Sequence, residues 1–206
     1  MKSLFALFSG LLISVTVMAQ EMAPDVLVKT VTNEVLDIVR KDKDIQSGNT
    51  RKAIDLVETK LLGHFNFTRM TQLAMARDWR QTTPAQQKIL TDEFRSLLVR
   101  TYAKALTEYK NQTVAFKPFV MKAGEADVRV RTEIMQSGAG KNIELDYYLE
   151  KPGAAWKVYD IEVGGISLVT NYRESFAAEV RNNGIDGLIK SLQAKNKSGE
   201  ATSVKK

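Results

Sequence analysis

Residues 156–173 read WKVYDIEVGGISLVTNYR, and this stretch decides the fold. Its first part, 156–163, is rich in β-branched and aromatic residues, which is typical of a strand. Gly164-Gly165 then ends the strand, because adjacent glycines favour a turn. Helical spacing of apolar residues resumes at about Thr170. A strand, a turn and a helix in so short a stretch indicate a fold that mixes strands and helices.

The segments before this stretch alternate apolar and charged residues, which is the two-residue period of a half-buried strand. The alternation covers 128–134 and 143–149, and a shorter edge strand is expected at 114–119. Turn residues at 138–140 and 151–153 separate these runs, as they do in hairpins. Consecutive hairpins form an antiparallel sheet, so we expect about four strands with one buried face.

Helical periodicity fills the chain before the strands and returns after them. The longest helix is expected to begin with Thr83 as N-cap and Pro84 at the first position. The expected helices are 24–40, 50–62, 68–74, 84–109, 170–181 and 185–192. The prediction is therefore an α+β fold with helices packed on one face of a curved, mainly antiparallel sheet. It forms a single domain over 20–194, followed by a basic flexible tail over 195–206.

The composition excludes several functional classes. The chain has 206 residues, of which 44% are hydrophobic and 26% charged, as in ordinary globular proteins. It has no cysteine, so disulfide scaffolds, thiolate metal sites and cysteine nucleophiles are ruled out. Its only histidine is His64, and no group of carboxylates or histidines has metal-ligand spacing. No nucleophile elbow or phosphate-binding glycine loop is present either, so we predict no metal, no cofactor and no enzyme.

The first nineteen residues have the pattern of a secretory signal peptide. Lys2 precedes an apolar run from Leu4 to Val17, and Ala19 provides a small residue for cleavage. The run would extend about 21 Å as a helix, less than the ~30 Å of a bilayer core. We therefore expect 1–19 to be cleaved and the mature protein to be exported in soluble form; a retained anchor is the alternative.

Cleavage would remove one lysine and lower the formal charge from +6 to +5. Such a charge suits anionic membrane surfaces or an acidic partner, but an ordinary solvated surface explains it equally well. Nucleic acid is excluded as a partner, because the compartment is wrong and no aromatic–basic motif is present.

Two carboxylates on adjacent expected strands, Asp146 and Asp160, are candidates for acid–base chemistry. Asp146 lies on the polar side of its strand, so we expect it to be exposed. Asp160 interrupts an apolar strand. Either it is a catalytic base, or it is a buried carboxylate satisfied by backbone donors or by Arg173.

Aromatic side chains with polar tips suit the wall and mouth of a cavity for an amphiphile. An ordinary core is the alternative explanation for each of them. The candidates are Phe65, Phe67, Tyr102, Tyr147, Tyr159 and Tyr172.

Three segments resemble the MlaC family. They are HFNFTRM at 64–70, followed by Trp79 and the long helix; the stretch 156–173; and GIDGLI at 184–189. The resemblance spans essentially the whole mature chain. The sequence departs from the family pattern at Gly164, where glutamate is common, and at Asn66, where aspartate is frequent. We therefore assign no polar role to Gly164, and Asn66 weakens the case for a carboxylate in its loop.

The resemblance implies a soluble periplasmic phospholipid carrier that maintains the lipid asymmetry of the outer membrane, and relatives are linked to toluene tolerance. Its implied partners are phospholipid, an inner-membrane ABC transporter with MCE domains and an outer-membrane lipoprotein–porin complex, and the chain is expected to be a monomer. The implied fold is NTF2-like, with acyl chains in a hydrophobic pocket. A two-chain lipid exposes roughly thirty methylenes at about 0.8 kcal/mol each, so an apolar pocket alone makes transfer through water feasible.

From this carrier hypothesis we predict the lipid-binding residues. Sheet residues would form the wall, three residues of the long helix would face them, and 166–172 would form the mouth. Arg173 would lie near the phosphate or pair with Asp160. The predicted set is Leu98, Tyr102, Leu106, Val128, Val130, Ile134, Ile143, Leu145, Tyr147, Tyr159, Ile161, Val163, Ile166, Leu168, Val169, Tyr172 and Arg173.

Two other functions fit the same pattern. The first is an NTF2-like enzyme for a small apolar substrate, with Asp160 as base and Tyr159 or Tyr172 as oxyanion donor. The second is an exported interaction module whose basic face binds acidic partners without an internal ligand.

Overall fold

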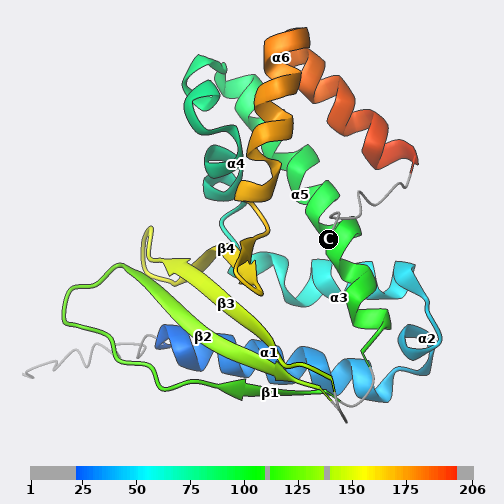
Figure 1. Cartoon of the computed structure of the whole chain (residues 1–206), viewed down its shortest axis with the longest axis vertical. Coiled ribbons are helices and arrows are strands. Elements are labelled where there is room, and N and C mark those ends of the chain that lie inside the picture. The colour runs from blue at the N-terminus through cyan, green and yellow to red at the C-terminus, as the bar shows by residue number, and fades with distance from the viewer. Residues whose placement is uncertain (1–21, 110–111, 137–139, 199–206) are drawn as a thin grey trace, which may run out of the picture.

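A computed structural model describes residues 22–109, 112–136 and 140–198 (Figure 1). The expected signal segment and the end of the expected tail lie outside these residues. No helix in the described ranges is long and apolar enough to cross a membrane. The α-helices are α1 (Pro24–Lys41), α2 (Lys43–Gln46), α3 (Thr50–Lys60), α4 (Phe67–Met75), α5 (Pro84–Thr107) and α6 (Arg173–Ser198). Short 3-10 helices are η1 (Leu62–His64), η2 (Ala76–Gln81) and η3 (Thr170–Tyr172).

The strands form one antiparallel sheet in the order β1-β2-β3-β4-β5, so each strand pairs with its neighbour in sequence. They are β1 (Thr113–Phe116), β2 (Asp127–Met135), β3 (Ile143–Glu150), β4 (Lys157–Val163) and β5 (Ile166–Ser167). The predicted α+β class and antiparallel meander are confirmed. The sheet has one strand more than expected. Gly164 and Gly165 both have positive φ, 57° and 85°, which closes a tight hairpin onto β5.

Local sequence explains the two long helices. The Thr83 side chain accepts a hydrogen bond from the Gln86 N–H, and the Gln86 side chain caps the Thr83 N–H in return. The expected pair of C-terminal helices is confirmed: η3 leads into α6, and a sharp bend at Gly184, where φ is 70° and ψ is -179°, divides α6 into two helical parts. A residue with a side chain adopts this φ only at a cost, so glycine permits the bend. α6 extends to Ser198, into the segment expected to be a tail.

The buried apolar residues form three clusters instead of one continuous core. The first joins α4, α5 and α6 and contains Phe94 and Tyr172. The second lies between α1 and the sheet and contains Val28 and Leu149. The third joins α1, α2, α3 and α5 around Val39. Figure 1 shows α1 along the sheet and the α4–α5–α6 layer beyond its β4 end, so the sheet is covered unevenly.

Candidate functional site

The inner face of the sheet, which α1 covers in part, has two halves that differ in packing. At one end the inward side chains are fully buried against α1; these are Val128, Val130, Leu149 and Val158, which we call the packed face. At the other end the inward side chains are equally apolar but partly solvent accessible. These are Ile134, Ile143, Leu145, Tyr147, Ile161 and Val163, which we call the uncovered face.

The strand register assembles the uncovered face. Tyr147 of β3 pairs with Val130 on one side and Ile161 on the other. Leu145 pairs with Thr132 and Val163 in the next row. Inward side chains therefore form continuous rows across three strands, since alternate residues of a strand share a face.

The helices leave this face without a tightly packed cover. β2 packs against α1 and β4 against α4, but β3 makes no comparable contact with any helix in the described residues. Two connections hold α3 and α4 at the β4 end: the bridge between Phe65 and Val158, and a hydrogen bond from the Lys157 Nζ to the Gly63 carbonyl. Partly accessible apolar residues of α3 and α5, and of the chain just after each helix, pack against the α1–α2–α3–α5 cluster; they are Ile54, Val57, Leu61, Leu106 and Tyr109.

Tyr147 lies at the boundary between the two faces. Burial raises the pKa of its phenol, and a hydrogen bond with Thr32 of α1 acts in the opposite direction. Its side chain is nevertheless reached by solvent in part. The candidate site is therefore the partly accessible apolar surface of the uncovered face, with Thr32 of α1 beside Tyr147.

The predicted lipid-binding residues separate into distinct environments. Ile134, Ile143, Leu145, Tyr147, Ile161 and Val163 come together on the uncovered face, whereas Val128 and Val130 lie in the packed face. Leu98, Val169 and Tyr172 are buried in the α4–α5–α6 cluster, with Tyr102 packed against it. Leu106 packs against the α1–α2–α3–α5 cluster. At the expected mouth, Ile166 is 53% exposed and Leu168 is partly buried.

The prediction that Tyr159 points inward is wrong. A β-bulge shifts the register between Tyr148 and Leu149, so strict alternation fails in β4. The Tyr159 ring lies 6.3 Å from the ring of Tyr148 on the outer face. Its hydroxyl donates to the Asp127 carboxylate at 2.8 Å. A bulge of this kind leaves no clear signal in a single sequence.

Asp160 is a buried carboxylate held by protein donors. It accepts hydrogen bonds from the Ile161 N–H at 2.8 Å, the Ser167 hydroxyl at 2.5 Å and the Val169 N–H at 3.3 Å. Burial raises its pKa, and these three donors oppose the shift. Arg173 does not contact it; the Arg173 guanidinium donates to the Leu73 carbonyl at 3.0–3.1 Å. The structure thus matches the expectation of backbone donors for Asp160.

The expectation that Asp146 is exposed is wrong. It does point to the outer face, but only 5% of the residue is accessible, because the Arg129 guanidinium covers it and donates to its carboxylate. Arg129 also lies 3.5 Å from Glu162, and Tyr148 donates to Glu162 at 2.9 Å. A cross-strand ionic network therefore explains both the burial of Asp146 and the polar pattern of the outer face.

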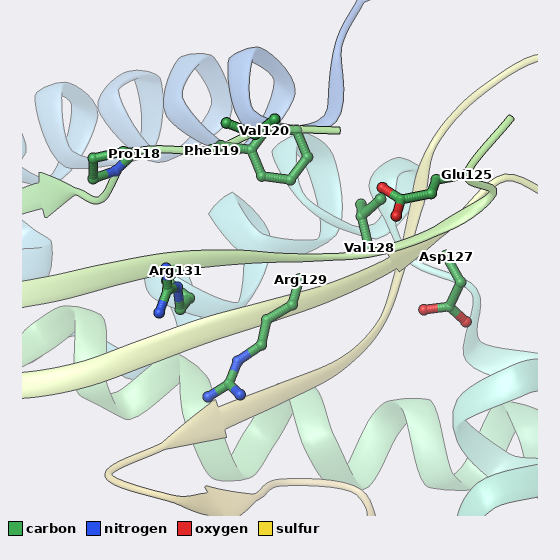
Figure 2. A pocket seen from close by; sticks show the side chains of 8 residues that line it. All are labelled: Pro118, Phe119, Val120, Glu125, Asp127, Val128, Arg129 and Arg131. Carbon is green, nitrogen blue, oxygen red and sulfur yellow. The ribbon is translucent and has the colours of Figure 1, made fainter. Parts of the chain in front are cut away.

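Two hollows lie elsewhere on the molecule, and charged residues contribute to the lining of both. One of about 240 Å³ lies beside β2 and the loop that follows β1 (Figure 2). The other, of about 540 Å³, lies along α6 near Glu179 and Lys190. Sequence reasoning overlooked Thr32 of α1, whose side chain hydrogen-bonds with Tyr147. The amphipathic pattern of α1 was the available signal.

Comparison with known proteins identifies the family. A family model described as MlaC protein matches residues 29–194. The toluene tolerance protein ttg2D of Pseudomonas putida is 28% identical over 201 residues, covering 91% of this chain and 90% of its own. The intermembrane phospholipid transport system binding protein MlaC of Haemophilus influenzae is 22% identical over 175 residues, covering 84% and 82%.

A solved structure extends this similarity to three dimensions. The phospholipid-binding protein from Ralstonia solanacearum, determined in complex with a phospholipid, is 40% identical and superposes with a TM-score of 0.77. The match covers 87% of this chain and 98% of that protein. The chain belongs to the MlaC family.

Proposed function

We propose that this protein is a phospholipid carrier whose acyl-chain site is the uncovered face. The observation that supports it is the row of six apolar side chains that the fold leaves accessible while neighbours on the same strands are fully buried. Exposed apolar surface costs about 25 cal/mol per Å², so a fold that retains it gains by covering it with a ligand. The phospholipid in the Ralstonia solanacearum relative supports the same choice of ligand.

The chemistry of the site suits lipid transport without catalysis. The uncovered face offers apolar contacts and the phenol of Tyr147, and such a surface binds tails without acting on them. The enzyme alternative fits less well, because the Asp160 oxygens already accept three hydrogen bonds from protein donors. The strand pairing also puts Asp160 opposite Tyr148 of the outer face.

The carrier hypothesis includes export and two membrane partners. The segment 1–19 would direct the chain to the periplasm and be removed there, leaving a monomeric carrier. The carrier would exchange phospholipid with an inner-membrane ABC transporter bearing MCE domains and with an outer-membrane lipoprotein–porin complex. The name of the Haemophilus influenzae relative, a binding protein of an intermembrane transport system, supports this assignment.

Native mass spectrometry of the purified mature protein tests the proposal, together with extraction of bound lipid into organic solvent. We expect a mass increase of about one phospholipid, removed by extraction. Protein that carries no lipid, and that takes none up from vesicles, would contradict the proposal.

A further inference from the structure

β2 is longer than β1, so part of β2 has no neighbouring strand on one side. β1 pairs with β2 only from Thr132 to Met135. One further bond follows, from the Lys117 N–H to the Arg131 carbonyl at 3.0 Å. Pro118 comes next, and the chain leaves the sheet, since proline has no N–H to donate. Residues 127–131 therefore border β3 alone, and we call this stretch the β2 edge.

The β2 edge presents unpaired backbone groups at strand spacing. Alternate residues of an antiparallel strand direct both their N–H and C=O to the same neighbour. The Lys117–Arg131 bond shows that Arg131 faces the β1 side, and Arg129 and Asp127 share its parity. Among the described residues, no protein hydrogen bond is made by the N–H and C=O of Arg129 and Asp127, or by the N–H of Arg131. These groups form a template for one more strand.

A hollow lies directly against this edge. Its volume is about 240 Å³, and Asp127, Arg129 and Arg131 line one side of it. Residues 118–120 line the other side, and Figure 2 shows this segment running along β2. The hollow therefore lies between the β2 edge and residues 118–120.

Charged side chains of both signs line the hollow, and they differ in whether they already have a partner. Arg129 is paired with Asp146, whereas Arg131 makes no ion pair within the described residues. The two nearby carboxylates already accept hydrogen bonds: Asp127 from Tyr159 at 2.8 Å and Glu125 from the Lys122 N–H at 2.9 Å. Both carboxylates keep their negative charge, but Arg131 is the charged lining side chain that has no polar partner within the described residues, so an acidic side chain of a ligand would pair with it.

We propose that the β2 edge binds an extended peptide segment of a partner protein by strand addition, with an acidic side chain beside Arg131. Backbone hydrogen bonds with Arg129 and Asp127 hold the bound segment. Alternate side chains of that segment contact residues 118–120 on one face and Arg131 on the other. This site lies on the strand edge, so it does not compete with a ligand on the uncovered face. The inference does not depend on the lipid hypothesis.

Amide hydrogen exchange of the full mature chain, read residue by residue by NMR, tests the proposal. The probe is a capped peptide of alternating valine and threonine with one central aspartate. At saturation the Arg129 and Arg131 amides should exchange at least about tenfold more slowly, as hydrogen-bonded amides do. The Val128 and Val130 amides face β3 and should not change. The same peptide with alternate backbone nitrogens methylated lacks the pairing donors and should have no effect.

Three variants separate backbone pairing from charge. R131A should weaken binding about two- to fivefold, as expected for an exposed ion pair. R131P also removes the N–H and should weaken it by about tenfold or more. R100A, which removes an exposed arginine of α5 that has no ion pair within the described residues, should bind normally. If R131P does not fold, the comparison of the unmodified and methylated peptides still tests whether binding needs backbone hydrogen bonds.

Several results would overturn the proposal. The first is that millimolar peptide leaves the exchange rates of the Arg129 and Arg131 amides unchanged. The second is that the methylated peptide slows these amides as much as the unmodified peptide does. The third is that these amides already exchange slowly without any peptide. The last result, if it depended on protein concentration, would point to a second copy of the chain as the occupant. Slowing by phosphatidylglycerol vesicles but not by peptide would assign the surface to a membrane instead.

Discussion

Leu149 and Leu145 lie on the same strand and are the same residue type, yet their surroundings differ. Leu149 is fully buried beneath α1, with 0% of its surface exposed. Leu145 lies on the uncovered face and remains partly accessible. The difference follows their positions along the strand, because Leu149 belongs to the buried cluster that contains Val28 of α1 and Leu145 belongs to none of the three buried clusters. One sheet thus combines a folding core with a surface suited to a ligand.

The comparison of Leu149 with Leu145 shows that apolar character alone does not tell whether a residue stabilises the fold or is available to bind a ligand. A side chain packed on all sides stabilises the fold, whereas an apolar side chain left accessible is available for binding. Substitutions on the two faces should therefore change different properties.

The largest effect on stability is expected for L149A. Removing a fully buried leucine side chain typically lowers the free energy of unfolding by about 2–5 kcal/mol. L145A should lower it by only about 1 kcal/mol or less, because its site is already open to solvent and leaves little new cavity. Urea unfolding of the delipidated proteins measures both. Equal losses would show that the two faces are packed alike.

The largest effect on binding is expected for I161E. A carboxylate on the uncovered face would have to be desolvated beneath acyl chains, so co-purified phospholipid should fall by about tenfold or more. E144Q, on the exposed outer face of β3, is the matched control and should retain its lipid. Normal lipid content in I161E would place the binding site elsewhere.

Asp160 extends the comparison to the opposite side of β4. Its pKa is raised by burial, so the native state binds the proton more tightly than the unfolded chain does. The contribution of this group to stability should therefore fall as pH rises from its ordinary pKa of 3.8 through the raised value.

The variant D160N removes this titration, and its amide can donate to the Ser167 hydroxyl. Its free energy of unfolding should vary less with pH over that interval, while lipid loading stays nearly intact. If the free energy of unfolding varied with pH in the same way for the wild type and for D160N, the raised pKa of Asp160 would be contradicted. Loss of lipid from well-folded D160N would instead connect this side of the strand to the site.

The smallest effect is expected for Y147F. The substitution removes the hydroxyl that reaches Thr32 but keeps the ring on the uncovered face. A net hydrogen bond contributes about 0.5–1.5 kcal/mol, so stability should fall by no more than that, and lipid content should not change. A large loss of lipid would mean that the hydroxyl contacts the ligand directly.

Much of the fold was predictable from the sequence, because local signals and tertiary structure agree. The Thr83-Pro84 cap starts α5, and the alternation in 128–134 and 143–149 lies within β2 and β3. β5 was not expected because its two residues are too short to show a period. The break at Gly184 was predictable, because a glycine that follows two asparagines ends the regular pattern, and its non-helical φ and ψ do divide α6 into two helical parts.

The candidate site was predictable only in part. Alternation predicted which face Leu145 and Val163 share, but it contains no information on which helix covers a strand. Val169 and Tyr172 were therefore assigned to a mouth, although they pack within the α4–α5–α6 cluster. Tyr159 was misplaced because the bulge in β4 interrupts the two-residue period.

The most direct test of the account is photo-crosslinking with a phospholipid that carries a diazirine in its acyl chain, followed by peptide mapping. The account predicts labels on β3 at 143–147, on β4 at 161–163 and on the accessible residues of α3. Labels confined to the outer face of the sheet, or to the packed face around Leu149, would contradict it.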